Sequence, residues 1–482
     1  MSPSSQPASL DEIAASLLAK KGLELVSCRT VQSLWAGYGH ICRVQARFPT
    51  PQGKEEENLS LVLKYINPPA TKRRQQNDEG HLRKILSYQV EQHFYAHLAP
   101  RLLLLSRGAA GQTQTDGGEV AVAECLGSVH DGSATALLLR DLQKEVPSAY
   151  HRLFFPSSPP PGQGANGDGD KATKPAPAFP LALEKRGTLT PDLAGAALDW
   201  LAGFHGLFWR AEEKARYAAA AATDDSATHL VPPPLEFAAA ASKNHHQQPP
   251  AAVVHGVWQN GGYTYLATRR SEHAALEDDD GSEWSAALCR RSSASPGKSI
   301  AEQVAFYLSP AHPATSRYAT LIHGDVKSEN MFGRSAAPSS STNTAAAAKV
   351  AFFDFQYVGA GLGVCDLAKL FTCSVPVSLL VSSSSSSSSS GPEEEGEMLA
   401  MQPGERALLE RYLARLVAVA EGGGGGEAVC YPWDVFVGHW EAALVDWLRF
   451  QAGWGFWGNT AWLEARVREI LSRRPTAEDW EA

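Results

Sequence analysis

The sequence predicts an α+β fold in which one domain is divided into two lobes. Strand-like apolar segments separated by glycine turns precede Leu142, whereas apolar residues at helical spacing dominate later segments such as 193–208 and 440–448. The 482 residues would suit about three average domains, but much of the chain is low-complexity sequence, so one two-lobed domain accounts for it better. The boundaries that we expect are 1–24 for an N-terminal helical extension, 25–142 for the first lobe and 143–482 for the second.

Composition excludes several classes of protein. The chain has 52 acidic and 43 basic residues, a net charge of -9 and no basic block, which argues against a nucleic-acid partner. Its seven cysteines form no C-x-x-C pair and predict free thiols in a reducing compartment, the cytoplasm. No apolar run reaches the roughly 20 residues that cross a bilayer, so we expect no membrane span. No pattern implies a protein partner.

Four low-complexity tracts are predicted to be insertions in surface loops. Their Pro, Ser, Gly, Thr and Ala residues cannot bury enough apolar surface to offset the entropy of ordering them. The tracts lie near 156–178, 335–348, 382–397 and 421–427. Each falls between the segments that carry a clear pattern. The tract at 335–348 would be tolerated at the tip of a hairpin, because the two strand ends stay fixed.

The first predicted elements are a helix and a pair of strands. Ser9 and Glu12 form a capping box, and apolar residues then recur at helical spacing until Gly22. Residues 34–44 follow as strand, glycine turn and strand. Gly37 and Gly39 in that turn would let backbone amides approach phosphate oxygens, although a G-x-G pattern alone is equally typical of an ordinary hairpin.

A third strand and a helix complete the pattern of the first lobe. The apolar strand over 59–66 carries a single lysine, Lys64. Apolar residues recur along the helical segment that follows, which leaves Glu91 free to face a cleft as the partner of this lysine. Glu124, on a nearby strand, is an alternative partner. A solvated surface position for Glu91 also stays open.

The second lobe begins after a linker over 137–142. A helix over 193–208 has apolar and aromatic residues at core spacing, and within it His205 is more typical of a packed core histidine than of a catalyst.

The most informative segment starts at His323 and spells H-G-D-V-K-S-E-N up to Asn330, and Asp354 follows 24 residues later, after the apolar run 350–353. Phosphoryl transfer needs one carboxylate to orient the attacking hydroxyl, together with an Asn and a second Asp that hold magnesium against the phosphate oxygens. Asp325, Asn330 and Asp354 are residues of these types. We therefore predict ATP and Mg²⁺ as cofactors, Asp325 as the catalytic carboxylate, and Asn330 and Asp354 as metal ligands.

Together with the D-F-Q triplet at 354–356 and the D-L-A triplet at 366–368, this string resembles the aminoglycoside phosphotransferase and choline kinase-like superfamily, which includes ecdysteroid kinase-like proteins. The resemblance covers roughly residues 25 to 470. It implies a bilobal protein-kinase-like fold with a small β-rich N-lobe and a larger, mostly helical C-lobe. It also implies a small-molecule alcohol as the phosphate acceptor.

The resemblance also implies roles for further residues. In the first lobe, Lys64 would reach the α and β phosphates while paired with Glu91, and the linker residues Arg140, Asp141 and Leu142 would hydrogen-bond the adenine edge through their backbone. In the second lobe, Lys327 would neutralise charge on the transferred phosphate. His323 would brace the strand that leads to Asp354, and Asp366 would accept amides of the catalytic loop. These last two roles are structural. Lys327 could also be an exposed loop lysine.

Two other interpretations compete with a small-molecule kinase. A protein kinase shares H-x-D-x-K-x-E-N, but Asp354 and Asp366 are only 12 residues apart, which leaves no room for an activation segment. Gln356 in place of the usual glycine also argues against a protein kinase. A catalytically silent scaffold is the other alternative. It is disfavoured because Lys64, Asp325 and both expected metal ligands are present.

The acceptor is not identified by the sequence. Choline kinases favour asparagine where Gly324 stands, whereas glycine is shared with aminoglycoside, ecdysteroid and other alcohol kinases. Aromatic residues in 257–265 and in the C-terminal tail could cage a quaternary amine, with Glu441 or Asp446 attracting the cation. The tail holds Trp433, Trp440, Trp447, Trp454, Trp457 and Trp462. Their spacing around 440–448 is typical of a helix core face, so packing is the preferred interpretation.

Overall fold

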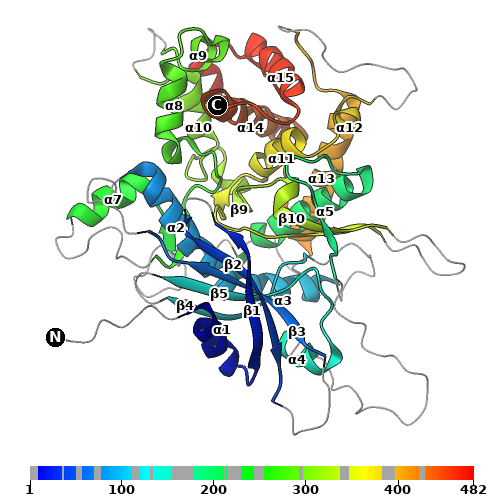
Figure 1. The fold of residues 1–482 in the computed structure, drawn as a ribbon. Helices are drawn as coiled ribbons and strands as arrows, with labels where there is room; N and C mark the ends of the chain where they lie inside the picture. The colour runs from blue at the N-terminus through cyan, green and yellow to red at the C-terminus, as the bar shows by residue number, and fades with distance from the viewer. Residues whose placement is uncertain are drawn as a thin grey trace, which may run out of the picture.

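The computed structural model describes residues 9–34, 37–49, 57–69, 78–110, 120–130, 134–154, 178–210, 212–213, 229–243, 254–291, 297–336, 347–382, 397–422 and 429–481. Most of each of the four tracts predicted to be insertions lies outside these residues. The described chain forms a β-rich lobe followed by a larger helical lobe, coloured blue to cyan and green to red in Figure 1. The predicted α+β fold with two lobes is confirmed.

The N-lobe is built on an antiparallel sheet of five strands in the order β1-β2-β3-β5-β4. The strands are β1 (Glu24–Ser33), β2 (Gly39–Arg47), β3 (Leu59–Ile66), β4 (Cys125–His130) and β5 (Thr135–Arg140). Alternating apolar residues of β2 and β3 pack beneath helix α1 (Leu10–Ala19), whose start is capped by Ser9 and Glu12 as predicted. This packing fixes β3, and therefore Lys64, in the middle of the sheet.

A continuous helical segment crosses from the N-lobe sheet toward the C-lobe. It consists of α2 (Glu79–His93), a π-helical turn η2 (Phe94–Leu98) and α3 (Ala99–Ala110). Asp78 caps the start of α2 because its carboxylate accepts the backbone N–H of His81 at 2.9 Å. Almost every residue in the second half of α2 is buried, because the helix packs on the sheet on one side and on strand β8 (Gly256–Trp258) of the C-lobe on the other.

The C-lobe is organised around the buried helix α5 (Pro191–Trp209), which packs against α13 (Pro403–Glu421). The other α-helices described in this lobe are α7 (Pro234–Lys243), α8 (Arg270–Glu277), α9 (Glu283–Leu288), α10 (Ile300–Tyr307), α11 (Gly363–Cys373), α12 (Val377–Val381), α14 (Trp433–Trp454) and α15 (Thr460–Arg473). The short helix α4 (His151–Phe154) packs instead with the core of the N-lobe. Figure 1 shows α8, α10, α14 and α15 gathered at the end of the molecule opposite the N-lobe sheet. Among the described residues, no helix is long and apolar enough to cross a membrane.

Two small sheets lie between the helices of the C-lobe and the N-lobe. One has the order β11-β10-β6 and the other β7-β8-β12-β9. Their strands are β6 (Leu181–Ala182), β7 (His229–Val231), β9 (Thr320–Ile322), β10 (Met331–Arg334), β11 (Lys349–Phe352) and β12 (Gly359–Gly361). Every residue of β9 is buried, as are three of the four in β11, so the loops at their ends are held on a rigid base.

Candidate active site

The catalytic string forms the connection from β9 to β10, and a hairpin brings it next to Asp354. Strands β10 and β11 pair with Met331 opposite Phe352, and the backbone N–H of Phe353 donates to the carbonyl of Asn330 at 3.0 Å. This register places Asn330 beside the residue that precedes Asp354. Asn330 and Asp354 are therefore far apart in sequence, on either side of the tract between the two strands, but they lie close together in space.

Asp325 lies in the centre of a group of polar side chains. Its carboxylate accepts Lys327 Nζ at 3.0 and 3.2 Å and Asn330 Nδ2 at 3.0 Å, and Asn330 Nδ2 also donates to the Asp325 carbonyl at 2.8 Å. Burial opposes the charge of Lys327, but attraction by the Asp325 carboxylate outweighs it and raises the pKa of Lys327 above its usual value. Lys327 therefore stays protonated and holds the Asp325 carboxylate in one orientation.

Asp354 adopts a left-handed backbone with a φ of 65°, which is unusual for a residue that is not glycine. Its Oδ1 accepts Lys64 Nζ at 3.1 Å and Gln356 Nε2 at 2.7 Å. Burial would raise the pKa of this carboxyl, but Lys64 lowers it below its ordinary value, so Asp354 is ionised. With Oδ1 engaged by two donors, Oδ2 is left as the oxygen that can coordinate a metal.

The lysine of β3 and a glutamate of α2 form the predicted type of ion pair. Lys64 Nζ lies 2.5 Å from Glu91 Oε2, and both side chains are almost fully buried. Burial raises the pKa of Glu91 to about 7, against the pull of Lys64. Glu124 instead pairs with Arg140 at 3.3 Å. Of the two carboxylates considered from the sequence, Glu91 is the one that contacts Lys64.

The donor set fits magnesium. Asn330 donates through its amide nitrogen to Asp325, so its carbonyl oxygen is the atom that can coordinate, and Asp354 offers a carboxylate oxygen. Oxygen ligands in small number, completed by phosphate oxygens and water, are typical of magnesium sites in phosphoryl-transfer proteins. Within the described part of the chain, no group of three or more His, Cys, Asp or Glu residues could hold a metal ion.

Asp366 and His323 support the catalytic loop from below. The fully buried Asp366 carboxylate accepts the backbone N–H groups of His323 at 2.7 Å and Gly324 at 2.9 Å, and it lies 3.1 Å from His205 Nε2. His323 Nε2 donates to the carbonyl of Phe353 at 3.0 Å, and burial lowers the pKa of His323 so that the ring stays neutral. Asp366 therefore contacts the backbone of the loop that carries Asp325, and His323 contacts the residue before Asp354, as the structural roles expected for them require.

The two glycines predicted to contact phosphate occupy different environments. Gly37 has a φ of 72° and is exposed, and a Cβ added there would meet no atom within 4 Å. Gly39 is buried with a φ of 152°, and its Cβ would lie 2.0 Å from the carbonyl oxygen of Tyr65. Gly39 is therefore needed for the close approach of β2 to β3, and only Gly37 is free to face a ligand.

The side chains of the predicted linker are engaged within the N-lobe. Asp141 accepts Ser60 Oγ at 2.7 Å and lies 3.4 Å from Arg43 Nε, whereas Arg140 pairs with Glu124. Leu142 is buried and its carbonyl accepts the N–H of Phe179 at 2.8 Å. Any contact of this segment with a nucleotide would thus be made by the backbone. A nucleotide contact of Arg140, Asp141 and Leu142 stays a prediction.

Two residues outside the predicted set also hold the site together. Gln356 links Asp354 to α2, because Ser87 Oγ donates to Gln356 Oε1 at 3.1 Å while Gln356 Nε2 donates to Asp354. Lys369 is 3% exposed, and its Nζ donates to the carbonyl of Gly324 at 2.7 Å. A lone lysine among the apolar residues that follow Asp366 was the available signal for Lys369. The contacts of Gln356 had no signal in the sequence.

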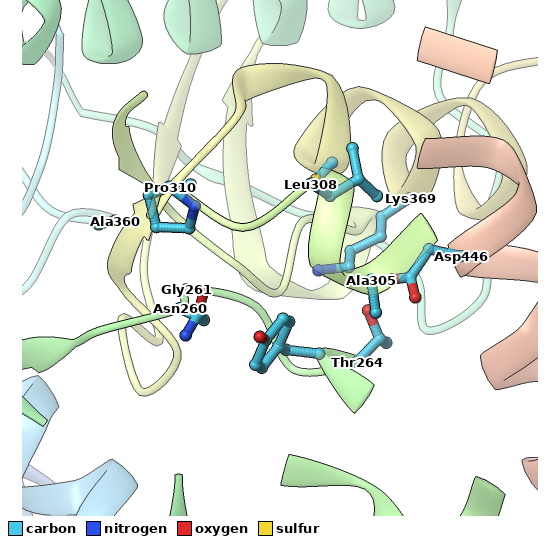
Figure 2. Close-up of a pocket in the computed structure, with 12 residues that line it drawn as sticks. Asn260, Gly261, Thr264, Ala305, Leu308, Pro310, Ala360, Lys369 and Asp446 are labelled. Carbon is cyan, nitrogen blue, oxygen red and sulfur yellow. The ribbon is translucent and has the colours of Figure 1, made fainter. Parts of the chain in front are cut away.

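A small cavity lies behind the catalytic loop. Figure 2 shows the Lys369 nitrogen turned toward it, with Asn260 and Gly261 on one side and Asp446 on the other. Its volume of about 20 Å³ is enough for roughly one water molecule. This cavity is therefore too small to accept an alcohol substrate, and it belongs to the support of the loop.

Three of the six tail tryptophans are buried in the core and two more, Trp433 and Trp457, pack against it, in agreement with the preferred interpretation. Trp440, Trp447 and Trp462 are at most 4% exposed, whereas Trp454 is 55% exposed. Phe450 is fully buried in the core, and its ring contacts both Tyr263 and the exposed Trp454.

A β-rich lobe with a lysine–glutamate pair, joined to a helical lobe with an Asp-x4-Asn loop and a second aspartate, defines a kinase-like fold. Residues 292–385 match the model of the ecdysteroid kinase-like family, which belongs to the CHK kinase-like and aminoglycoside phosphotransferase superfamily. The resemblance to this superfamily is confirmed. The match suggests a kinase-like small-molecule phosphotransferase and names no substrate for this chain. No curated protein matches the chain.

Proposed function

We propose that the protein transfers the γ-phosphate of ATP to a hydroxyl group of a small molecule. The observation that carries this proposal is two series of contacts, one from Glu91 through Lys64 to Asp354 and one from Lys327 through Asp325 to Asn330. The hairpin of β10 and β11 joins the two series. Residues of both lobes therefore contribute to one site.

In the proposed reaction, Asp325 orients the acceptor hydroxyl and receives its proton as the acceptor oxygen bonds to the γ-phosphorus and the bond to the leaving ADP oxygen breaks. Lys64 holds the α and β phosphates, and Lys327 offsets negative charge on the group in transfer. Magnesium held by Asn330 and Asp354 would neutralise the phosphate oxygens.

A small-molecule acceptor is favoured over a peptide. The 12 positions from Asp354 to Asp366 are taken up by a turn, strand β12 and the first residues of α11, so that no activation segment separates the two aspartates. A protein kinase uses that segment as its peptide platform. All seven cysteines are free, which supports the reducing cytoplasm as the compartment of the reaction. We keep 25–142 and 143–482 as the proposed lobe boundaries.

The test begins with a screen of aminated, steroidal and sugar alcohols with labelled ATP. For the acceptor found, Asp325→Asn should lower kcat by about a hundredfold or more while ATP binding is retained, because a general base contributes that much to proton transfer. Asp199→Asn is a matched control, since Asp199 forms an ion pair with Arg411 on the surface. Turnover by Asp325→Asn at the wild-type rate would show that the role of Asp325 is wrong. Binding of ATP with no phosphorylated product from any alcohol would favour a silent scaffold.

A further inference from the structure

A group of aromatic side chains lies directly beside the catalytic loop. The backbone N–H of Tyr263 donates to the carbonyl of Gly324 at 2.8 Å, which fixes Tyr263 relative to the neighbouring Asp325. Lys327 Nζ lies 5.9 Å from the centroid of the Tyr263 ring. The aromatic group is therefore next to the place where Asp325 and Lys327 would meet an acceptor.

The aromatic rings of this group contact one another. Tyr263 meets Tyr357 at 4.9 Å and 89° and Phe450 at 5.5 Å and 78°, and Phe450 stacks with Trp454 at 6.1 Å. We call Tyr263, Phe450 and Trp454 the aromatic cage. Several ring faces turned toward one point are the arrangement that binds quaternary ammonium groups in proteins.

The cage already holds a cation that belongs to the chain. The Cζ atom of Arg269 lies 3.7 Å from the ring centroid of Tyr263, 5.3 Å from that of Phe450 and 5.7 Å from that of Trp454. These distances are all within the range of a cation–π contact. Arg269 is only 1% exposed, and the cage is therefore filled by its guanidinium.

Arg269 is fixed in this position by directed contacts. Its Nε donates to the carbonyl of Tyr263 at 2.6 Å, and its Nη1 donates to Glu272 Oε1 at 2.9 Å. Burial would raise the pKa of Glu272, but Arg269 lowers it, so the carboxylate stays ionised and keeps the guanidinium in place. The buried Nη2 of Arg269 has no hydrogen-bond partner among the described residues.

The acidic residues that could attract a cationic acceptor are also paired. Asp446 accepts Arg449 at 2.9 Å, and Glu441 accepts Arg473 at 2.6 Å. A cation that approached the cage would meet the positive charge of Arg269 at short range, with no carboxylate of this group left without an arginine. Like charges at such a distance in a buried site repel each other strongly.

We propose that Arg269 is a specificity-determining residue that closes the aromatic cage to quaternary ammonium groups. This proposal rests on the proposed function, and it restricts the acceptor to an alcohol that does not present a cationic amine to the cage. Arg269 acts by occupying the cage and touches no reacting atom.

The proposal is tested by binding, which requires no turnover. Tetramethylammonium is titrated against wild type, Arg269→Ala and Arg269→Lys, and binding is followed by tryptophan fluorescence and calorimetry. Arg269→Ala should bind this cation at least about tenfold more tightly than wild type, because it removes both the charge and the side chain that fill the cage. Arg269→Lys keeps the charge and should behave like wild type.

The wild-type titration can also overturn the proposal, so the test does not depend on the folding of a variant at the buried Arg269. A saturable fluorescence change with tetramethylammonium that disappears in Trp454→Leu would show that the cage is open. A folded Arg269→Ala without any gain in binding would also contradict the proposal. Choline and its uncharged isostere 3,3-dimethylbutan-1-ol are then compared as acceptors, and wild type should discriminate against choline. If neither is phosphorylated by any variant, the binding result still decides the role of Arg269, whereas the proposed phosphotransfer is judged by the alcohol screen.

Discussion

At the residue scale, the carboxylates of the site differ because of their surroundings. Asp354 is reached by Lys64 and Gln356 and has a lowered pKa, whereas Glu91, bound to the same lysine, has a raised pKa because it is more deeply buried. The sequence predicted Lys64 and Asp354 from motifs. It carried no signal for the contacts of Gln356 or Arg269, because these depend on residues brought together from distant parts of the chain.

Glu91 makes the stability of the protein depend on pH. Its pKa of about 7 in the folded state is above the ordinary value of 4.5, so folding favours the protonated form. This contribution is fully present below about pH 4.5 and is lost as the pH rises through about 7. A shift of this size corresponds to on the order of 3 kcal/mol.

Glu91→Gln removes this titration, so we expect its melting temperature to rise relative to wild type as the pH increases from 5 to 8. The loss of the ion pair with Lys64 also changes the melting temperature, but by an amount that does not depend on the titration of Glu91. Only the pH dependence of the difference in melting temperature therefore tests the raised pKa. Thermal unfolding at several pH values measures it, with Glu145→Gln, at an exposed glutamate just after the N-lobe, as the control. A constant difference between Glu91→Gln and wild type over this range would contradict the raised pKa.

At the element scale, sequence signals that depend only on neighbouring residues predicted the structure correctly, whereas signals that depend on strand pairing did not always do so. The capping box at Ser9 and Glu12 starts a helix as predicted, since capping depends only on local residues. The glycine pattern before β2 is different. Gly39 is explained by its contact with β3, and the identity of that neighbour could not be known from a local pattern. The hairpin of β10 and β11 was predicted because its two ends carry clear strand and loop signals.

The two glycines of this turn provide a matched pair of variants. Gly39→Ala should destabilise the protein by about 3 kcal/mol or more, because alanine combines a disfavoured backbone with a clash against the Tyr65 carbonyl. Gly37→Ala should cost only about 1 kcal/mol, the strain of its positive φ, and should instead raise the KM for ATP. Denaturant unfolding and ATP kinetics separate the two effects. Equal losses of stability would show that Gly39 is not required by the packing of β3.

At the scale of the whole molecule, the C-lobe holds the helix that carries Glu91. Arg83 of α2 donates to the carbonyl of Thr268 and lies 3.4 Å from Glu272, the partner of Arg269. The carboxylate of Glu79 accepts the first two backbone N–H groups of α8 at 3.1 and 3.2 Å. The helix that carries Glu91 is therefore tied to the segment that carries Arg269. Motifs indicated each lobe, but not this connection between them.

Arg83→Met tests whether this connection positions α2. The substitution keeps the length of the side chain and removes the donors to Thr268 and Glu272, so α2 loses a fixed point on the C-lobe while Glu272 keeps Arg269. We expect faster hydrogen exchange in α2 and α8, and a KM for ATP that rises several-fold because Glu91 holds Lys64 less firmly. Arg47→Met is the control, since Arg47 forms an exposed ion pair with Glu24 at the far end of β2. If exchange in α2 does not change, the helix is held by its packing on the N-lobe sheet alone, and the contacts with Thr268 and Glu272 only join the surfaces of the two lobes.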